Sequence, residues 1–495
     1  MPPKPSRKVA PKPAFQAAFD AAVALHQQGK FAQARTMYED ILRKQPGHAA
    51  CLHMLGIMAT QEKDHERAVA LFDRAIALQP AFAEAHANRG VALRELGRAS
   101  EAIQSYDKAI ALRPGYARAF FNRGNAFAAM GDLQAAAASY SRAIELEPGN
   151  AEALANLGNA LVASLQVDAA IAQYDLAIRA NPAFADGHFN KACALLLKGD
   201  LAEGFRLFEW RWKTPGIRMQ PRDFNAPLWL GGAPLAGRTI LLHSEQGLGD
   251  TIQFCRYVPL VAAMGARVLV EVPAVLLGVL QTLDCDVEWI ARGAPLPAFD
   301  CQCPFMSLPL ALGTTLHSIP WPGPYLRSDK SHVRKWSDTL GPRVRPRVGL
   351  TWSGSRHSAN DRNRNLPLAT LLAHLPAGCD YFGLQNEVRD SDRAALAGAT
   401  QVRHLGDGIV DFQDTAALCG LMDVIVSVDT SVAHLAGALG CPVWVLLPLR
   451  PDFRWLLGRS DSPWYSSVRL YRQGQDREWA PVLERVAAEL EALAP

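Results

Sequence analysis

A period of 34 residues runs through about the first two fifths of the chain and constrains its fold more than any other feature. Prolines recur at this spacing, each just beyond an apolar helical pattern: Pro46, Pro80, Pro114, Pro148 and Pro182. The same frame holds alanines (Ala34, Ala68, Ala102, Ala136, Ala170), aromatic residues (Tyr38, Phe72, Tyr106, Tyr140, Tyr174, Phe208) and glycines (Gly56, Gly90, Gly124, Gly158). Repeats of this length bury their apolar faces only by stacking on one another. The period therefore predicts an all-α solenoid.

A second set of glycines marks the turn within a predicted helical hairpin: Gly29, Gly97, Gly131 and Gly199. Glycine adopts the left-handed backbone conformation of such turns at the lowest cost. The pattern resembles the tetratricopeptide repeat over residues 15–214, with the last unit losing the pattern after Phe208. The resemblance implies a protein-binding surface.

Asparagines recur in the same frame on the first helix of the hairpins: Asn88, Asn122, Asn156 and Asn190. A primary amide offers both a donor and an acceptor, so a row of them can hold a peptide backbone without reading its side chains. The resemblance places the first helix on the concave side, and a similar ladder is known in the O-linked N-acetylglucosamine transferases. We expect these residues either to bind an acceptor or to bond a neighbouring repeat.

Composition and charge exclude several classes of protein. The chain has 495 residues, 49% of them hydrophobic, and a formal net charge of +3, which is too small for a duplex nucleic-acid partner. It has no apolar run of membrane-spanning length, and its basic, proline-rich start lacks the apolar stretch of a secretory signal. We expect a cytoplasmic protein with a disordered tail at residues 1–14. Its nine cysteines, an odd number in apolar surroundings, indicate reduced thiols.

The pattern changes after Trp212. A linker rich in proline and glycine is expected at 215–238. A βαβ unit then follows, with strands at 239–243 and 267–272 and a helix from Thr251. A second series of short apolar runs follows: RVGLTW (347–352), DYFGLQ (380–385), QVRHL (401–405), DVIVSV (423–428), PVWVLL (442–447) and VRLYR (468–472).

These runs predict two doubly wound α/β halves, residues 239–330 and 331–495. Ligands of such sheets bind at the carboxyl ends of the strands, so chemistry is expected in the loops after His243, Trp352, Leu384 and Val428. Two facing halves would enclose a cleft between them.

The first glycine turn carries the candidate base. Gly247, Gly249 and Asp250 resemble part of a dinucleotide fingerprint, with Glu271 at the end of the next strand. The third glycine is missing, and a carboxylate at the helix start repels pyrophosphate. Asp250 is better suited to taking a proton, or to capping its helix.

A diphosphate site is expected in the second half. Thr430 and Ser431 offer hydroxyl groups at a helix start with free N–H groups, whereas Asp429 is interpreted as holding the turn. The alternative is a simple N-cap. The loop after Trp352 is cationic, with Arg356, Arg362 and Arg364, and is either a phosphate-binding flap or a solvated surface loop: no residue pattern decides between the two.

The turn at Gly249 and Asp250, followed by Pro259, and the segment DTSVAHLAGALG together resemble the ADP-heptose-type heptosyltransferases of the GT-B class, over residues 239–472. The resemblance implies that Asp250 is the general base. It places the following residues at the donor: Gly249, Thr430, Ser431, His434 and, as the basic phosphate ligand, Arg362 or Arg364. This chain carries arginines where a lysine is usual.

The joined resemblances predict a tetratricopeptide solenoid followed by a GT-B fold of two Rossmann-like halves. The expected function is sugar transfer, with inversion and without metal, from a nucleotide sugar to a protein held by the solenoid. The nucleotide sugar is a co-substrate and no cofactor is expected. If Asp250 is not the base, Glu245 is the next candidate. The alternative function is a scaffold whose α/β part binds a nucleotide sugar without turnover.

Overall fold

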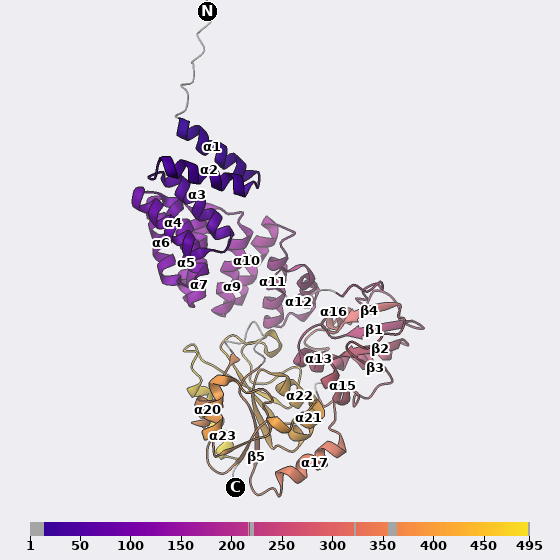
Figure 1. Ribbon diagram of the computed structural model, residues 1–495. Helices are drawn as coiled ribbons and strands as arrows, with labels where there is room; N and C mark the ends of the chain where they lie inside the picture. Colours follow the sequence, from indigo (N-terminus) through magenta and orange to yellow (C-terminus); the bar gives the residue numbers. More distant parts are fainter. Residues whose placement is uncertain (1–13, 216, 218–221, 321–322, 355–363, 494–495) are drawn as a thin grey trace, which may run out of the picture. The chain divides into compact units, whose positions relative to one another are not determined.

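The computed structural model describes residues 14–215, 217, 222–320, 323–354 and 364–493 (Figure 1). The chain divides into two compact units, Met1–Gly187 and His188–Pro495. The expected tail at residues 1–14 lies outside the described residues except for Ala14, which begins the first helix. Arg356 and Arg362 also lie outside them.

The first unit is a stack of helical hairpins, which confirms the predicted solenoid (Figure 1). Its helices are α1 (Ala14–Gln27), α2 (Phe31–Lys44), α3 (Ala49–Gln61), α4 (His65–Leu78), α5 (Ala83–Glu95), α6 (Ala99–Leu112), α7 (Ala117–Met130), α8 (Leu133–Leu146), α9 (Ala151–Ala163) and α10 (Val167–Ala180).

The periodic glycines and aromatic residues meet inside four of the hairpins. A Cβ atom on Gly124 would lie 2.6 Å from Cε1 of Tyr140, which is closer than a Cβ atom can approach. The same pairing recurs at Gly56 with Phe72, Gly90 with Tyr106, and Gly158 with Tyr174. Glycine therefore lets the two helices of a hairpin close on a buried ring, which explains why both positions repeat together.

The turn between the two helices of a hairpin has a residue with positive φ. Gly97 and Gly131 have φ values of +76° and +82° there. Lys63 and Leu165 stand at the equivalent positions with φ values of 63° and 59°, so two hairpins make this turn without glycine.

The second unit begins with most of α11 (Ala185–Lys198), followed by α12 (Leu201–Phe208) and the 3₁₀ helix η1 (Glu209–Lys213). The sequence frame extends the repeats to residue 214, whereas the compact units divide after Gly187. The last repeat-like helices are therefore grouped with the α/β part of the chain.

Two parallel sheets form the rest of the second unit (Figure 1). The first has the order β3-β2-β1-β4 and consists of β1 (Thr239–His243), β2 (Arg267–Val272), β3 (Glu288–Ala291) and β4 (Cys301–Pro304). The second has the order β10-β9-β8-β5-β6-β7 and consists of β5 (Arg347–Thr351), β6 (Asp380–Gly383), β7 (Val402–His404), β8 (Val424–Val428), β9 (Val443–Leu447) and β10 (Val468–Arg472). This architecture agrees with the predicted pair of Rossmann-like halves.

Helices cover the sheets and connect their strands. They are α13 (Leu248–Phe254), α14 (Val258–Ala262), α15 (Ala274–Leu280), α16 (Leu308–Ala311), α17 (Lys330–Leu340), α19 (Leu368–Leu372), α20 (Asp390–Gly398), α21 (Phe412–Gly420), α22 (Ser431–Leu439) and α23 (Ala480–Glu491), with 3₁₀ helices η2 (Cys255–Tyr257), η3 (Phe305–Ser307), η4 (Gly406–Gly408) and η5 (Phe453–Trp455). Buried strand residues such as Val348, Leu350 and Val426 form the core of the second half with Leu368 and Val486. In the described ranges, no helix has the length and apolar character needed to cross a bilayer.

Candidate functional site

A cleft of about 770 Å³ lies in the second unit, at the carboxyl ends of strands from both sheets. Its lining is drawn from the β1–α13 loop and the start of α13, from α15, and from the segments after five strands of the second sheet: Gln246, Gly247, Leu248, Gly249, Asp250, Val275, Thr351, Ser353, Gly354, Arg364, Leu384, Gln385, Asn386, Glu387, Ile409, Val410, Asp411, Phe412, Thr415, Asp429, Thr430, Ser431, Val432, His434, Asp452 and Arg454. Six of the predicted site residues are brought together here: Gly249, Asp250, Arg364, Thr430, Ser431 and His434.

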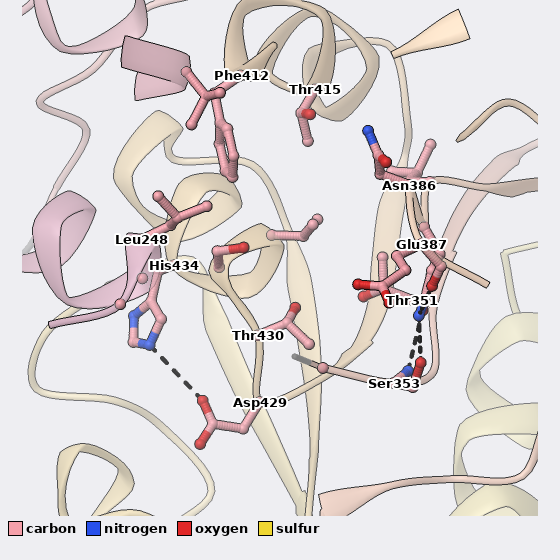
Figure 2. Close-up of a pocket in the computed structure, with 18 of the residues that line it drawn as sticks. Leu248, Thr351, Ser353, Asn386, Glu387, Phe412, Thr415, Asp429, Thr430 and His434 are labelled. Carbon is pink, nitrogen blue, oxygen red and sulfur yellow. Dashed lines mark hydrogen bonds and ion pairs between the residues drawn. The ribbon is translucent and has the colours of Figure 1, made fainter. Parts of the chain in front are cut away.

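Close packing of α13 against α22 joins the two halves of this cleft. A Cβ atom on Gly249 would lie 2.8 Å from Cδ2 of His434, so glycine is needed where the two helices approach. The His434 ring stacks on Trp455, with 5.2 Å between ring centroids, and its Nδ1 lies 3.0 Å from the Tyr465 hydroxyl. Its Nε2 lies 3.8 Å from Oδ1 of Asp429 (Figure 2). Burial and the nearby arginines hold the pKa of His434 well below its usual value, so the ring is neutral.

Asp250 lies in the first turn of α13, which begins at Leu248 rather than at the expected Thr251. Its Oδ2 accepts a hydrogen bond of 2.8 Å from the Gly247 N–H, and its Oδ1 is paired with the guanidinium of Arg454. Burial raises the pKa of Asp250, whereas Arg454 opposes that rise. Asp250 therefore caps its helix and also faces the cleft.

Two further carboxyl groups lie beside Asp250. Arg454 Nη1 donates to Asp452 Oδ1 at 2.6 Å. Burial and the charge of Asp452 raise the pKa of Asp429 to about 6. Arg454 and Asp452 were not predicted from the sequence, because the candidate loops were those after four strands and did not include the loop after β9. The rule that ligands lie at the carboxyl ends of parallel strands would have indicated that loop as well.

The start of α22 faces the same cleft. Thr430 has the backbone position of an N-cap, but its side chain makes no capping hydrogen bond, and its Oγ1 lies 3.1 Å from Ser427 Oγ. The Thr430 hydroxyl therefore does not serve as the helix cap. The positive end of α22 thus points at the cleft, where an anion would be stabilised.

Arg364 lines the cleft rather than the outer surface. Its Nη1 donates to the Asp429 carbonyl oxygen at 3.1 Å, and its guanidinium carbon would lie 2.6 Å from a Cβ atom on Gly354. Arg364 therefore faces the cleft, and its part in binding a phosphate stays a prediction. The part that Arg362 plays stays a prediction.

Glu245 lies behind the cleft and is absent from its lining. Its Oε1 accepts from the Met306 N–H at 3.1 Å and from Arg211 Nη2 at 3.3 Å. Arg211 is fully buried and also donates to Ser307 Oγ at 2.7 Å. Burial raises the pKa of Glu245 to about 7. The η1 segment is therefore fixed to the β1–α13 loop through buried charges.

The asparagines of the predicted ladder are half-buried. Asn88 Nδ2 lies 2.9 Å from Nε2 of His53, and Asn156 Nδ2 donates to Oδ1 of Asn125 at 3.0 Å. Both partners lie on the preceding hairpin, so the alternative of bonding a neighbouring repeat is realised at these two positions. Asn122 occupies the equivalent position in the first unit, and Asn190 belongs to the second unit.

Two other acidic groups take structural positions. Glu271 is buried and paired with Arg222, outside the cleft. Asp392 accepts from Trp352 Nε1 at 3.2 Å and from the Leu368 N–H at 3.3 Å. Within the described part of the chain, no group of three or more His, Cys, Asp or Glu side chains is arranged to hold a metal ion.

Comparisons with known proteins identify the repeats. Family models described as tetratricopeptide repeat match residues 19–81, 155–209 and 71–104, and one described as TPR repeat matches residues 90–131 and 124–164. Protein FlbA of Caulobacter vibrioides is 27% identical over 334 residues, which cover 62% of this chain and 55% of FlbA. This chain thus spans about half the length of that relative. The matched 62% of this chain is longer than the first unit, so the likeness extends into the second unit.

Solved structures similar to this chain cover less of it. The pilF structure from Pseudomonas aeruginosa is 20% identical, covering 41% of this chain and 93% of its own, with a TM-score of 0.38. A MamA structure is 24% identical, covering 34% and 92%, with a TM-score of 0.32. TTC0263 of Thermus thermophilus is 25% identical, covering 37% and 100%, with a TM-score of 0.31.

Proposed function

We propose that this tetratricopeptide-repeat protein, a distant homologue of FlbA with a C-terminal α/β region of two parallel sheets, is a glycosyltransferase. The observation that carries the proposal is one cleft in which a carboxylate, Asp250, lies with an arginine, Arg364, and with the start of a helix whose N-cap side chain makes no capping hydrogen bond. A base and an anion site within one cleft suit transfer of a group from a phosphate leaving group to a hydroxyl.

The donor is a nucleotide sugar, with its diphosphate at the start of α22. The N–H groups of that first turn, the hydroxyls of Thr430 and Ser431, and the guanidinium of Arg364 supply donors and positive charge. His434 is neutral and therefore contributes shape rather than charge. A cleft of about 770 Å³ lies within the usual size range of ligand sites.

The reaction is a single displacement. The Asp250 carboxylate takes the proton of an acceptor hydroxyl, and that oxygen forms a bond to the anomeric carbon of the sugar. The bond from the anomeric carbon to the phosphate oxygen breaks on the opposite face, and its electron pair leaves with the nucleotide diphosphate. The configuration at the anomeric carbon is thereby inverted. Arg364 and the α22 N–H groups stabilise the charge of the leaving group, the role that a metal ion has in other transferases.

The acceptor is a protein or peptide held by the repeats. Tetratricopeptide solenoids present extended binding surfaces, and half-buried amides such as Asn122 lie on the first helix of their hairpin. With a protein acceptor, the repeats would bind the substrate on which the α/β region acts.

The test is incubation of the purified full chain with a panel of radiolabelled nucleotide sugars. Hydrolysis of one donor, or label transferred to protein, is the expected result, and EDTA should leave the rate unchanged. Activity lost in EDTA and restored by manganese or magnesium would count against the metal-independent mechanism. Donor binding without hydrolysis or transfer would favour the alternative, a scaffold with an inactive transferase region.

A further inference from the structure

Arg454 occupies an unusual position for an arginine. It lies in η5, just after β9, and its side chain is only 8% exposed although it lines the cleft. One end of its guanidinium is paired with Asp250 from the first turn of α13, and the other with Asp452. The pair with Asp250 joins residues that are 204 positions apart, one from each α/β half.

Apolar groups surround this guanidinium. Its central carbon lies 4.4 Å from the ring centroid of Phe453 and 5.8 Å from that of Phe254, and Nη2 lies 3.9 Å from Sδ of Met306. The Phe453 ring is in turn packed by Phe205 and Phe208 of α12, at centroid distances of 6.3 and 6.1 Å. Few alternative positions are open to a charge packed in this way, and its attraction for a carboxylate is stronger than in water.

Both acidic and basic side chains act on the pKa of Asp250. Asp452, which follows β9, opposes the ionisation of Asp250, and Asp250 in turn opposes that of Glu245 in the preceding loop. Arg364 is another cation that lowers its pKa. Arg454 is in direct contact with Asp250. Without it, a buried carboxyl group among other carboxyl groups would hold its proton and could not accept one from the acceptor.

We propose that Arg454 is the positioning residue of the transfer: it keeps Asp250 ionised and fixed in orientation beside the acceptor hydroxyl. This assignment rests on the proposed function, since it concerns the base of that reaction. Arg454 acts through Asp250 and forms no bond to the sugar. Without Arg454, the burial of Asp250 would oppose the ionised form that a general base requires.

The experiment compares R454Q and R454K with the control R459Q in the full chain. Arg459 is a partly exposed arginine that pairs with Asp461, away from the cleft lining. The pKa of Asp250 is measured in the donor-free protein by ¹³C-carboxyl NMR titration, and kcat and KM for the donor are measured across pH.

In R454Q, we expect the titration midpoint of Asp250 to rise by about one pH unit or more, as loss of an adjacent opposite charge implies. The acid limb of the kcat profile should move in the same direction, with KM little changed. R454K should give a smaller rise, because a lysine cannot hold both carboxylates in the planar arrangement of a guanidinium. R459Q should match the wild type.

The outcomes separate this inference from the proposed function. An unchanged Asp250 midpoint in R454Q, in a protein that transfers sugar, overturns the role of Arg454 alone. A raised midpoint in a protein that turns over no donor supports the hold on Asp250 and overturns the proposed function. If R454Q fails to fold, R454K decides: its midpoint must rise and its kcat must recover at higher pH, and a fall in kcat at every pH overturns the inference.

Discussion

The repeats and the cleft are stabilised by contacts of opposite kinds. In the first unit, a ring such as Tyr140 packs on a glycine of the preceding helix, Gly124, and the same contact recurs in several hairpins. In the second unit, Asp250 meets Arg454 from 204 residues away, and the pair occurs once. Loss of one repeated contact leaves its copies in place, whereas loss of a single long-range contact has no substitute. The two units should therefore respond differently to the same kind of change.

The largest difference is expected from truncation. Removing residues 1–187 leaves α12 and η1 in place, and the remaining unit should fold, hydrolyse donor slowly and lose transfer to protein. Removing residues 1–214 also deletes Arg211, which leaves Glu245 as an uncompensated buried carboxyl group at a cost of roughly 3–5 kcal/mol. It also exposes the Phe453 face that Phe205 and Phe208 cover, at about 1.5–3 kcal/mol for each ring.

These losses approach the whole stability of a typical domain, about 5–15 kcal/mol. The longer deletion should therefore aggregate or show no cooperative thermal transition, as judged by size-exclusion chromatography and calorimetry. Equal melting temperatures for the two truncated proteins would show that η1 is not part of the α/β unit.

The next largest effect is expected from D250N. An amide can still accept the Gly247 N–H, so the helix cap is retained, and Arg454 keeps its pair with Asp452. A general base contributes typically about 10²- to 10⁴-fold in rate, so turnover should fall by at least roughly 100-fold, while donor affinity holds or rises slightly. Retention of more than about a tenth of wild-type turnover would make Asp250 a helix cap and not the base.

The contrast between the units also explains what the sequence could predict. The apolar runs ending at His243, Thr351 and Val428 are buried parallel strands, which read as continuous hydrophobic segments, and they were found within one or two residues. The strands Glu288–Ala291 and Cys301–Pro304 were missed because they are short and carry polar residues. Asp250 and Thr430 could be placed at the cleft because each lies at the start of the helix that follows such a strand. The partnership of Asp250 with Arg454 was not, because no local pattern links residues so far apart.

A smaller loss is expected from filling one hairpin. In G124A, the new Cβ would meet the Tyr140 ring at 2.6 Å, and G90A would meet Tyr106 at the same distance. Overpacking of this kind costs about 1–3 kcal/mol of unfolding free energy, and both variants should lose a similar amount. The control G115A has nothing within 4 Å of its new Cβ. Chemical denaturation measures all three, and unequal losses in G124A and G90A would contradict the equivalence of the repeats.

The asparagine ladder separates binding from stability. The double variant N122A/N156A removes two amides from the first helices, and if they hold an acceptor backbone its affinity should fall by roughly 1–3 kcal/mol in total. N88A extends the test to a third member of the ladder, because Asn88 is bonded to His53 on the preceding hairpin as Asn156 is bonded to Asn125. Titration calorimetry with the acceptor and thermal unfolding are measured together. Unaltered acceptor affinity with lowered stability would assign the asparagines to bonds between repeats.

The smallest expected effect is a gain in stability at a turn of the solenoid. Lys63 is exposed and has a φ of 63°, at the position where Gly97 and Gly131 make the same turn in other hairpins. A left-handed backbone conformation costs a residue with a Cβ roughly 1–2 kcal/mol, and glycine avoids that cost but loses more chain entropy on folding, at about 0.5–1 kcal/mol. K63G should therefore stabilise the first unit by about 0.5–1 kcal/mol. The reverse variant G97A has open space around its new Cβ, so its expected loss of similar size isolates the backbone effect from any clash. Both changes in unfolding free energy are obtained from the midpoints of denaturant unfolding, compared at equal slope of free energy against denaturant concentration. If K63G and G97A both destabilise the protein, the Lys63 side chain stabilises this turn by more than its left-handed backbone conformation costs.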